Sequence, residues 1–411
     1  MSEASVTGLS RSGQVHAVTA SFLGWMLDAL DFFIVTFMLD TLAEAFHVSK
    51  AKIVATLMIT LIFRPVGAII FGLLADRYGR RIPLMANVVF FSVVELACGF
   101  APNYTVFYIL RILYGIGMGG EWGVGASLAM EAVSPRWRGT FSGLLQSGYV
   151  MGYLLAAVVA RFVLPAWGWR PMFWIGGLPA LLAFYISSHV PESEAWKQHR
   201  PPSVSAVLRT VAAQWKSFLY LILFTTFMIF LSHGTQDLYP DFLGSEHHFS
   251  KALVSEIAVI YNIGAILGSI SIGMFSEKLG RRHAMIFAMV LSLLVIPLWA
   301  FGATTGILIL GAFLMQFGVQ GAWGIVPVHL TEMVPDETRG LVSGLAYQLG
   351  TLVGARAPVM EFSLSARFGY RWALAGFEIF TILALIVILA LGKERKGRSF
   401  HQTSETPVLT T

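Results

Sequence analysis

The sequence predicts an all-α integral membrane protein with twelve transmembrane helices, arranged as two pseudo-symmetric six-helix bundles with both termini in the cytoplasm. Three observations lead to this prediction. Hydrophobic residues make up 56% of the 411-residue chain and charged residues only 12%, about half the charged fraction of an ordinary soluble domain. Apolar runs long enough to cross a hydrocarbon core of roughly 30 Å recur along the chain. Finally, the second half repeats charged and glycine positions of the first half at a fixed offset.

The repeat is clearest in two short charged stretches. The stretch from Gly72 to Arg81 reads GLLADRYGRR, and the stretch from Gly273 to Arg282 reads GMFSEKLGRR, 201 residues later. Each lies between two apolar runs of bilayer length. A charged cluster in that position fits a tight loop at the membrane surface, since lipid does not tolerate exposed irregular backbone. The arginines favour the cytoplasmic side.

The same offset relates further pairs downstream. Glu131 corresponds to Glu332, and Arg138 corresponds to Arg339. Agreement at so many charged positions indicates two copies of one membrane unit. In such proteins the natural binding site is a path between the two repeats.

Charge and cysteine content narrow the possible classes. Most of the 28 Lys and Arg residues fall in predicted loops on one side, which places both termini in the cytoplasm. The formal net charge of +5 therefore reflects topology and predicts no nucleic-acid partner. The single Cys98 excludes an internal disulfide and offers no metal pattern, so we expect neither a metal nor a cofactor. The first apolar run contains Asp28 and Asp31 and lacks a cleavage site, so it is expected to remain as helix one.

The elements follow in order. A tail at 1–15 precedes the first bundle at 16–190, a cytoplasmic linker with a short surface helix spans 191–216, the second bundle covers 217–392, and a disordered tail begins at 393 and runs to 411. The helices expected in the first bundle are 16–41, 52–74, 82–101, 105–132, 138–163 and 171–190. Those expected in the second are 217–243, 252–276, 283–302, 305–332, 339–365 and 371–392.

The predicted helix seven carries the densest polar cluster within an apolar run. Residues three and four apart share a helix face, so His233 lies beside Gln236 and Asp237. Pro240 should loosen the helix there. The cluster is either a binding site or a buried polar network that shapes the helix.

These motifs resemble the major facilitator superfamily over nearly the whole chain. The doubled loop is the superfamily's signature. Arg111 begins the stretch RILYGIGMGG, which is similar to the family's fourth-helix motif, and Pro191-Glu192-Ser193 is similar to its mark after helix six. The resemblance implies a transporter and not an enzyme.

Helix seven resembles the lactate/pyruvate–proton symporters, which are related to the sialate–proton symporters. Their pattern is N-x-x-[S/T]-H-x-[S/T]-Q-D-x-x-x-T, and the run from Ser232 to Asp237 matches it, whereas Ile229 replaces the Asn and Asp241 the closing Thr. The resemblance implies proton-coupled symport of a small, lactate- or pyruvate-like carboxylate by alternating access, in a bacterial-type inner (plasma) membrane.

Two arginines within the apolar runs are candidate substrate ligands. Arg64 falls at mid-membrane and never loses its charge, so it must face an anion or water. It is expected to grip a substrate carboxylate, or alternatively to pair with Asp28 or Asp31. Arg356 is the corresponding cation of the second half, with Glu361 or Asp237 as an alternative partner. The substrate-binding candidates are Arg64, His233, Gln236, Arg356 and Asn262, although a structural role is the main alternative for Asn262.

Four carboxyls are candidate proton carriers. Glu121 is deep in helix four, and its repeat counterpart is Ala322, so the repeated fold does not need the acid. A carboxylate buried without a partner takes up a proton readily. The proton-coupling candidates are Asp28, Asp31, Glu121 and Asp237.

The repeated loops and helix ends are expected to form a conformational latch at the cytoplasmic side. Its acids would pair with its arginines in one state and release them in another. The latch candidates are Gly72, Asp76, Arg77, Arg80, Glu131, Arg138, Gly273, Glu277, Arg281, Glu332 and Arg339.

Other functions remain open from the sequence. Sialic acid, another sugar acid or an aromatic acid are alternative cargoes, with Trp25, Tyr149, Tyr261 and Trp323 as stacking surfaces. Sialate-type relatives usually carry extra central spans, for which the segment 191–215 has no room, so the small acid is favoured. An intramembrane enzyme or a solute sensor is a remote alternative, since no nucleophile motif or signalling domain appears. The expected partners are a small organic acid anion, a proton and the lipid bilayer, and the protein is expected to be a monomer.

Overall fold

The computed structural model describes residues 8–201 and 203–400, and within these ranges every regular element is helical. The first half contains α2 (Arg11–Phe37), α3 (Leu39–Ala45), α4 (Lys50–Tyr78), α5 (Arg81–Cys98), α6 (Tyr104–Ala132), α7 (Arg138–Trp167), α8 (Arg170–Ile175) and α9 (Ala180–His189). The linker contains α10 (Glu194–Gln198) and α11 (Val204–Ala213). The second half contains α12 (Trp215–Gln236), α13 (Tyr239–Glu246), α14 (Lys251–Leu279), α15 (Arg281–Phe301), α16 (Thr305–Trp323), α17 (Val326–Met333), the short 3₁₀ helix η1 (Asp336–Thr338), α18 (Arg339–Gly354), α19 (Ala357–Phe368) and α20 (Tyr370–Leu391).

Ten helices or closely joined helix pairs of the described chain are long and apolar enough to cross a membrane. The other two predicted spans, 105–132 and 339–365, coincide with α6 and with α18 followed by α19. The first of these is rich in glycine and carries Arg111 and Glu121, and the second is divided into pieces of 16 and 12 residues. The total of twelve membrane spans therefore stays a prediction. Ten of the predicted spans have the length and the apolar composition that a membrane-crossing helix needs.

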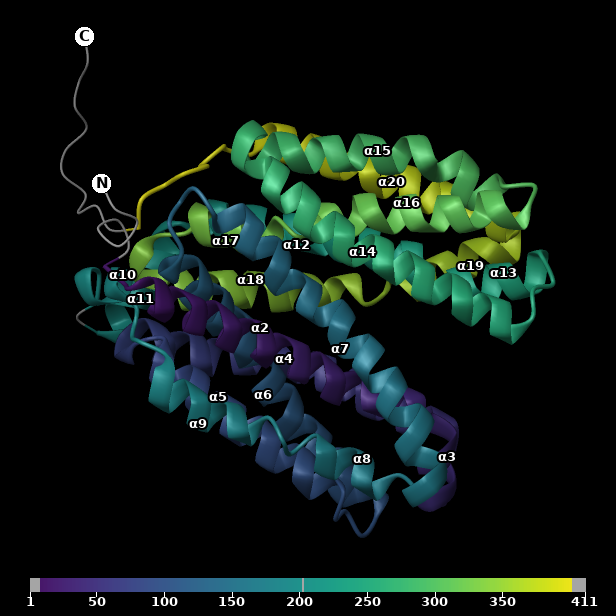
Figure 1. Cartoon of the computed structure of the whole chain (residues 1–411), viewed down its shortest axis with the longest axis horizontal. Coiled ribbons are helices and arrows are strands. Elements are labelled where there is room, and N and C mark those ends of the chain that lie inside the picture. The colour runs from purple at the N-terminus through teal and green to yellow at the C-terminus, as the bar shows by residue number, and fades with distance from the viewer. Residues whose placement is uncertain (1–7, 202, 401–411) are drawn as a thin grey trace.

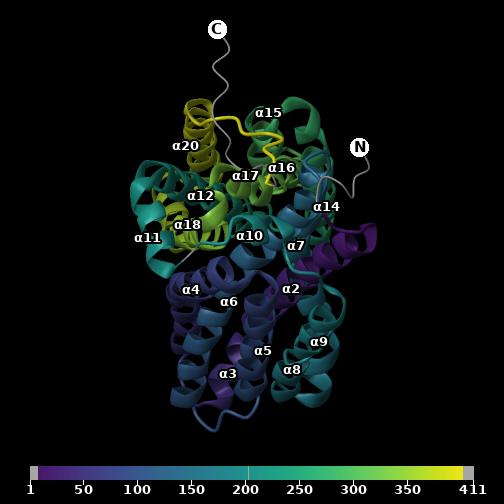
Figure 2. The same cartoon turned by 90° about the vertical axis from the view of Figure 1, so that its left-hand side faces the viewer.

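The helices form two groups that lie side by side. Figure 1 shows the group α2–α9 below and the group α12–α20 above, converging at the left and separating towards the right. Seen from the left, α10 and α11 lie across the junction of the two groups (Figure 2). We call this the latch end. Across the junction α14 packs against α7, and α18 packs against α4.

Glycine sets the close packing of α4 against α6. A Cβ added to Gly119 would overlap the backbone carbonyl of Arg64, and one added to Gly115 would overlap the carbonyl of Thr60. Small residues allow such backbone approach in lipid. The approach positions Arg64 firmly, because its own turn of α4 rests on α6.

Three spans of the second half are broken directly before a proline. Pro240, Pro327 and Pro358 each occupy the second position of a new helix, in α13, α17 and α19. Proline fits the first turn because the missing N–H has no intrahelical acceptor there. The break before Pro240 confirms the loosening predicted for helix seven, and it places Asp237 at the end of α12.

Candidate functional site

A cavity with a volume of about 480 Å³ lies between the two halves. It is walled by α2, α4 and α7 from the first half and by α12, the start of α13, α14, α16 and α18 from the second. Its lining residues are Phe32, Phe33, Thr36, Leu61, Arg64, Gln146, Tyr149, Val150, Tyr153, Ile229, Ser232, His233, Gln236, Asp237, Pro240, Tyr261, Asn262, Gln320, Trp323, Tyr347 and Thr351.

Arg64 is the one arginine or lysine in this wall. Its side chain is 3% exposed, and its Nε and Nη2 atoms have no hydrogen-bond partner among the described residues. Its Cζ lies 5.9 Å from the centre of the Tyr347 ring. None of the ion pairs found in residues 8–201 and 203–400 involves Arg64, so the alternative of a fixed pair with Asp28 or Asp31 is not observed.

The second half supplies a polar wall built on α12. The Nδ1 atom of His233 lies 2.8 Å from a carboxylate oxygen of Asp237, one turn away. Gln236 donates its amide to Gln316 over 2.7 Å, and Gln320 donates to the hydroxyl of Ser232 over 3.2 Å. The polar face of α12 predicted from the sequence therefore forms, and hydrogen bonds from Gln316 and Gln320 of α16 fix its side chains.

Sequence reasoning missed the two glutamines of α16. Gln316 also donates to the hydroxyl of Thr235 over 3.0 Å, and Gln320 lines the cavity. Both lie on the face of α16 that meets α12, four residues apart, and this spacing was the available signal.

The cavity is also strongly aromatic. Tyr149 stacks on Trp25 with ring centres 5.2 Å apart, and Tyr347 stacks on Trp122 with centres 4.1 Å apart. Tyr149, Tyr261 and Trp323 line the cavity as the sequence suggests, but Trp25 is 1% exposed and lies behind Tyr149. Trp25 therefore supports the stacking surface without offering one.

Of the two other substrate-binding candidates, Asn262 lines the cavity and Arg356 does not. Arg356 is exposed at the junction of α18 and α19, outside the residues that line the cavity, and the structure does not place it opposite Arg64. The expectation of a matching cation is wrong because the helix break before Pro358 leaves Arg356 on the outer face. Asn262 does line the cavity, although its amide donates to the Ala258 carbonyl of its own helix over 2.7 Å.

The predicted proton carriers of the first half lie behind the cavity wall. Asp28, Asp31 and Glu121 are fully buried and none lines the cavity. Both carboxylate oxygens of Asp31 and of Glu121 lack a hydrogen-bond partner among the described residues, and the Glu121 carboxylate packs against Gly24 of α2. Asp237 is the one acid of the described chain that reaches the cavity directly.

A buried ion pair completes this group. Arg111 donates to Glu95 over 2.7 Å, and both side chains are fully buried. Arg111 therefore holds a structural position inside the bundle. Glu121 and Asp28 lie within the electrostatic reach of Arg64, whereas Asp31 lies nearer to Glu95.

At the latch end, ion pairs cross between the halves. Glu131 pairs with Arg80 of its own half over 3.0 Å and with Arg339 of the other half over 2.7 Å. In the corresponding position Glu332 pairs with Arg281 over 3.1 Å and lies 3.8 Å from Arg138 of the other half. The repeat thus appears as two symmetric clusters.

Backbone groups tie the same loops together. Asp76 pairs with Arg80 over 2.5 Å and accepts bonds from the amides of Gly340 and Leu341 over 2.8 and 2.9 Å. Glu277 accepts a bond from the Gly139 amide and pairs with Arg281. Gly72 and Gly273 allow the two halves to approach this closely because they carry no Cβ. A Cβ on Gly72 would overlap the backbone of Leu341, and a Cβ on Gly273 would overlap the carbonyl of Gly139.

Arg77 does not join these clusters. Among the described residues its one recorded contact is with the ring of Tyr78, at 5.5 Å from its Cζ. Arg77 forms none of the ion pairs of the described residues, and its place in the latch stays a prediction.

The tail supplies a latch contact that the sequence did not suggest. Phe400 is fully buried between two guanidinium groups, with the Cζ of Arg138 at 3.5 Å and that of Arg339 at 3.7 Å from the ring centre. Arg398 pairs with Asp336 over 3.0 Å, and burial lowers the pKa of its guanidinium. Arg398 and Phe400 of the tail therefore contact the latch. The expectation of disorder for 393–411 stays a prediction, and 401–411 lie outside the described residues.

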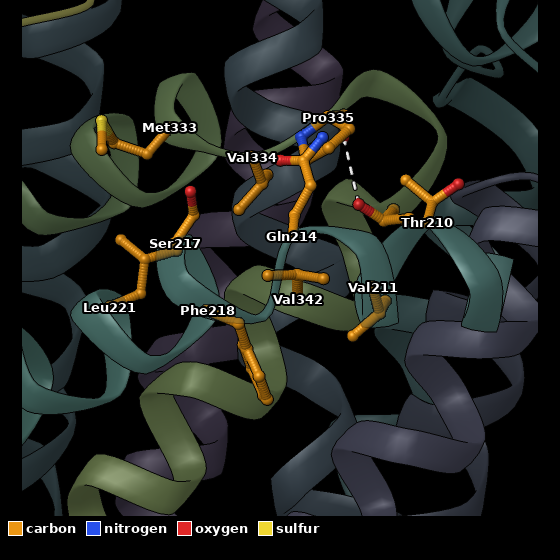
Figure 3. Close-up of a pocket in the computed structure, with 11 residues that line it drawn as sticks. Thr210, Val211, Gln214, Ser217, Phe218, Leu221, Met333, Val334, Pro335 and Val342 are labelled. Atoms are coloured by element: carbon orange, nitrogen blue, oxygen red, sulfur yellow. Dashed lines mark hydrogen bonds between the residues drawn. The ribbon is translucent and has the colours of Figure 1, made fainter. Parts of the chain in front are cut away.

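A second hollow adjoins the linker and is too small for a solute. Figure 3 shows Val211 and Gln214 from the linker facing Phe218 of α12 and Val342 of α18. Its volume is about 10 Å³, roughly the space of one water molecule. The hollow marks where α11 packs on the second half.

Comparison with known proteins assigns the family. The model of the Major Facilitator Superfamily matches residues 21–236 and 223–409. The carboxylic acid transporter protein homolog of Saccharomyces cerevisiae is 32% identical in an alignment of 399 positions that covers 90% of this chain and 64% of the yeast protein, so this chain spans less than two thirds of that relative. The sialic acid transporter NanX of Escherichia coli is 28% identical over 392 residues, 94% of this chain and 96% of NanX.

A solved structure agrees in fold. The proton:xylose symporter XylE bound to 6-bromo-6-deoxy-D-glucose aligns with a TM-score of 0.76 at 20% identity, covering 95% of this chain and 98% of that chain. These relatives are transporters and not enzymes. With the duplicated loops, the membrane-length helices and the cavity between two halves, the chain belongs to the Major Facilitator Superfamily.

Proposed function

We propose that this protein is a secondary active transporter that moves an organic acid together with a proton by alternating access. One observation carries the proposal: the wall of the central cavity contains a guanidinium, that of Arg64, that forms no ion pair with a described residue. A permanent cation at membrane depth needs an anion or water beside it. A substrate carboxylate supplies that anion, and the planar fork of arginine suits it.

The polar wall of α12 orients the rest of the substrate. His233 and Gln236 face the cavity from the half opposite Arg64. A substrate held by Arg64 on one side and by these groups on the other touches both halves. Its binding then favours states in which the halves close on it, which couples binding to the movement of the bundles.

The proton is carried by the buried carboxyls. Away from the latch end, the buried residues described in the first half include four acids, Asp28, Asp31, Glu95 and Glu121, and two arginines, Arg64 and Arg111. Ionised groups in this medium are expensive unless they are paired. At least one acid therefore binds a proton when the anion occupies Arg64, and Glu121 and Asp28 are the acids within reach of that arginine. One anion with one proton crosses without net charge.

The latch supports alternating access. The ion pairs of Glu131 and Glu332 join the halves at one end, while the helices separate towards the other end (Figure 1). Because the loop arginines predict a cytoplasmic latch end, this arrangement corresponds to a carrier closed towards the cytoplasm. We place it in a bacterial-type inner membrane as a monomer.

Two classes of substrate, which differ in the size of the acid, are candidates. A lactate- or pyruvate-like acid follows from the resemblance of helix seven. A larger sugar or aromatic acid is favoured by the aromatic wall and by a volume of about 480 Å³, within the range of roughly 300–1,000 Å³ usual for sites of larger ligands. The expectation that a sialate carrier needs extra central spans does not separate them, because this chain aligns with 96% of NanX.

Transport into proteoliposomes tests the proposal. With the purified protein and an inward proton gradient, labelled lactate, pyruvate and sialate are followed over time. The proposal predicts uphill uptake of at least one acid that stops when the gradient is collapsed. Uptake that continues unchanged after collapse would remove proton coupling, and a panel of unlabelled aromatic acids as competitors would rank the two substrate classes.

A further inference from the structure

Two carboxyls of the second half have no role in the mechanism above. Glu361 on α19 and Glu378 on α20 are fully buried, and all four of their carboxylate oxygens lack a hydrogen-bond partner within the described ranges. Neither lines the cavity. Unpartnered ionised carboxylates are not stable at membrane depth, so these two groups bind protons or a cation.

Their position places them directly behind the polar wall. A Cβ added to Gly234 would overlap the Oε1 atom of Glu378 and would lie 2.8 Å from the ring of Phe377. Gly234 follows His233, whose ring nitrogen lies 2.8 Å from Asp237 in the cavity wall. Glycine at this position therefore lets a buried carboxyl reach α12 beside the groups that face the cavity.

The two carboxyls and Asp237 form an acidic row. The helix of Glu361, α19, packs on the helix of Glu378, α20, and like-charge repulsion connects Asp237 with Glu361 and Glu361 with Glu378. Both α19 and α20 pack on α12, whose C-terminal end carries Asp237.

Among the described residues no lysine or arginine forms an ion pair with Glu361 or Glu378, whereas Asp237 has His233 as its partner over 2.8 Å. Arg367, in the last turn of α19, is exposed. The arginines of α15 lie in its first turn at the latch end. On α13, Asp241 is exposed and Glu246 pairs with Arg371 of α20 over 3.2 Å. Arg356, the nearest arginine along the chain to Glu361, forms none of the ion pairs of the described residues and is exposed. Because Glu361 and Glu378 have no counter-charge among the described residues, proton binding is the available compensation for these two groups.

We propose that Glu361 and Glu378 form a second proton-binding site, which exchanges protons with the cavity through His233 and Asp237. The inference rests on the proposed proton-coupled transport and adds a proton to it. Each proton comes from water on one side and returns to water on the other, and only O–H and N–H bonds form and break. When the row is ionised, repulsion separates α12 from α19 and α20, and protonation lets them close.

The second proton has an electrical consequence. One monoanion moving with two protons carries one net positive charge, whereas one proton makes transport electroneutral. One elementary charge across 100 mV changes the steady-state accumulation roughly 50-fold. We expect this dependence in the wild type and its loss in Glu361→Gln and in Glu378→Gln.

The experiment uses proteoliposomes without a pH gradient, in which a potassium diffusion potential of about 100 mV, negative inside, is imposed with valinomycin. Accumulation of the transported acid is measured for the wild type, both variants and the control Glu256→Gln, an exposed acid of the same half. Counterflow of labelled for unlabelled acid checks that each variant folds and binds. The control should respond to the potential as the wild type does.

The outcomes separate the two proposals. Wild-type accumulation that ignores the potential but follows a pH gradient would overturn the second site and leave the proposed function standing. The same holds if either glutamine variant keeps the full potential response. Absence of gradient-driven uptake in the wild type would instead overturn the proposed function. Wild-type accumulation that ignores the potential overturns the second site even where a variant fails counterflow, and loss of the potential response in a variant that keeps counterflow assigns the second proton to that carboxyl.

Discussion

Replacing Phe400 should loosen the latch end. The ring is fully buried between Arg138 of the first half and Arg339 of the second, so its contacts exist only while the halves are closed there. Burial of a phenylalanine contributes about 1.5–3 kcal/mol, and each cation–π contact about 0.5–2 kcal/mol. Allowing for partial repacking, Phe400→Ala should favour opening by about 2 kcal/mol, roughly a 30-fold change in the opening equilibrium.

Alkylation of a reporter cysteine measures this change. Because Cys98 is the one cysteine of the chain, Cys98→Ser gives a clean background. Leu341→Cys reports opening, since this position is 2% exposed and packs against Gly72 across the junction. A maleimide reagent should label it roughly 30 times faster when Phe400 is replaced by alanine.

The control and the refuting result are equally direct. Phe368→Ala removes a phenylalanine that is 63% exposed on α19, and it should leave the labelling rate within a factor of about two. If Phe400→Ala labels at the rate of the background protein, the tail does not hold the latch closed. Faster labelling in both variants would indicate general destabilisation and would equally refute the specific role of Phe400.

Three further predictions follow from the packing and the buried charges. Gly119→Leu should prevent stable folding, because the added side chain would overlap the carbonyl of Arg64. Size-exclusion chromatography checks folding, and a loss of less than about 1 kcal/mol in the free energy of unfolding would contradict the close packing of α4 on α6. Glu121→Gln should keep counterflow but lose uphill uptake, measured with and without a proton gradient, and normal accumulation would mean that another acid carries the proton. Glu131→Gln removes a buried partner of two arginines and should cost about 3–5 kcal/mol of the closed state, read out by faster labelling of the same reporter; an unchanged rate would remove Glu131 from the latch.

The sequence predicted best those features that the membrane makes costly. A charge inside an apolar run is conspicuous because lipid tolerates it poorly, and Arg64 and Asp237, predicted on that ground, both line the cavity. The repeat likewise indicated that Glu131 lies beside the charged loops, because its counterpart Glu332 occupies the same position in the second copy. Glu131 does pair with the loop residue Arg80 and with Arg339. These predictions needed no knowledge of how the helices are rotated.

What failed depended on helix rotation and on long-range contacts. Arg356 looked equivalent to Arg64, but a break before Pro358 turned it to the outer face. Gln320 and Tyr347 are ordinary residues in helices, and only the packing of α16 and α18 brings them to the cavity. Phe400 lies in a polar tail, and no local pattern shows that two distant guanidiniums enclose it.

The central claim is that Arg64 holds the substrate carboxylate, and equilibrium binding of the transported acid to Arg64→Lys and Arg64→Ala tests it most directly. A bidentate site does not accept lysine freely, so the account predicts at least a 10-fold weaker affinity in the lysine variant and no measurable binding in the alanine variant, with intact folding in both. Wild-type affinity in either variant would contradict the account.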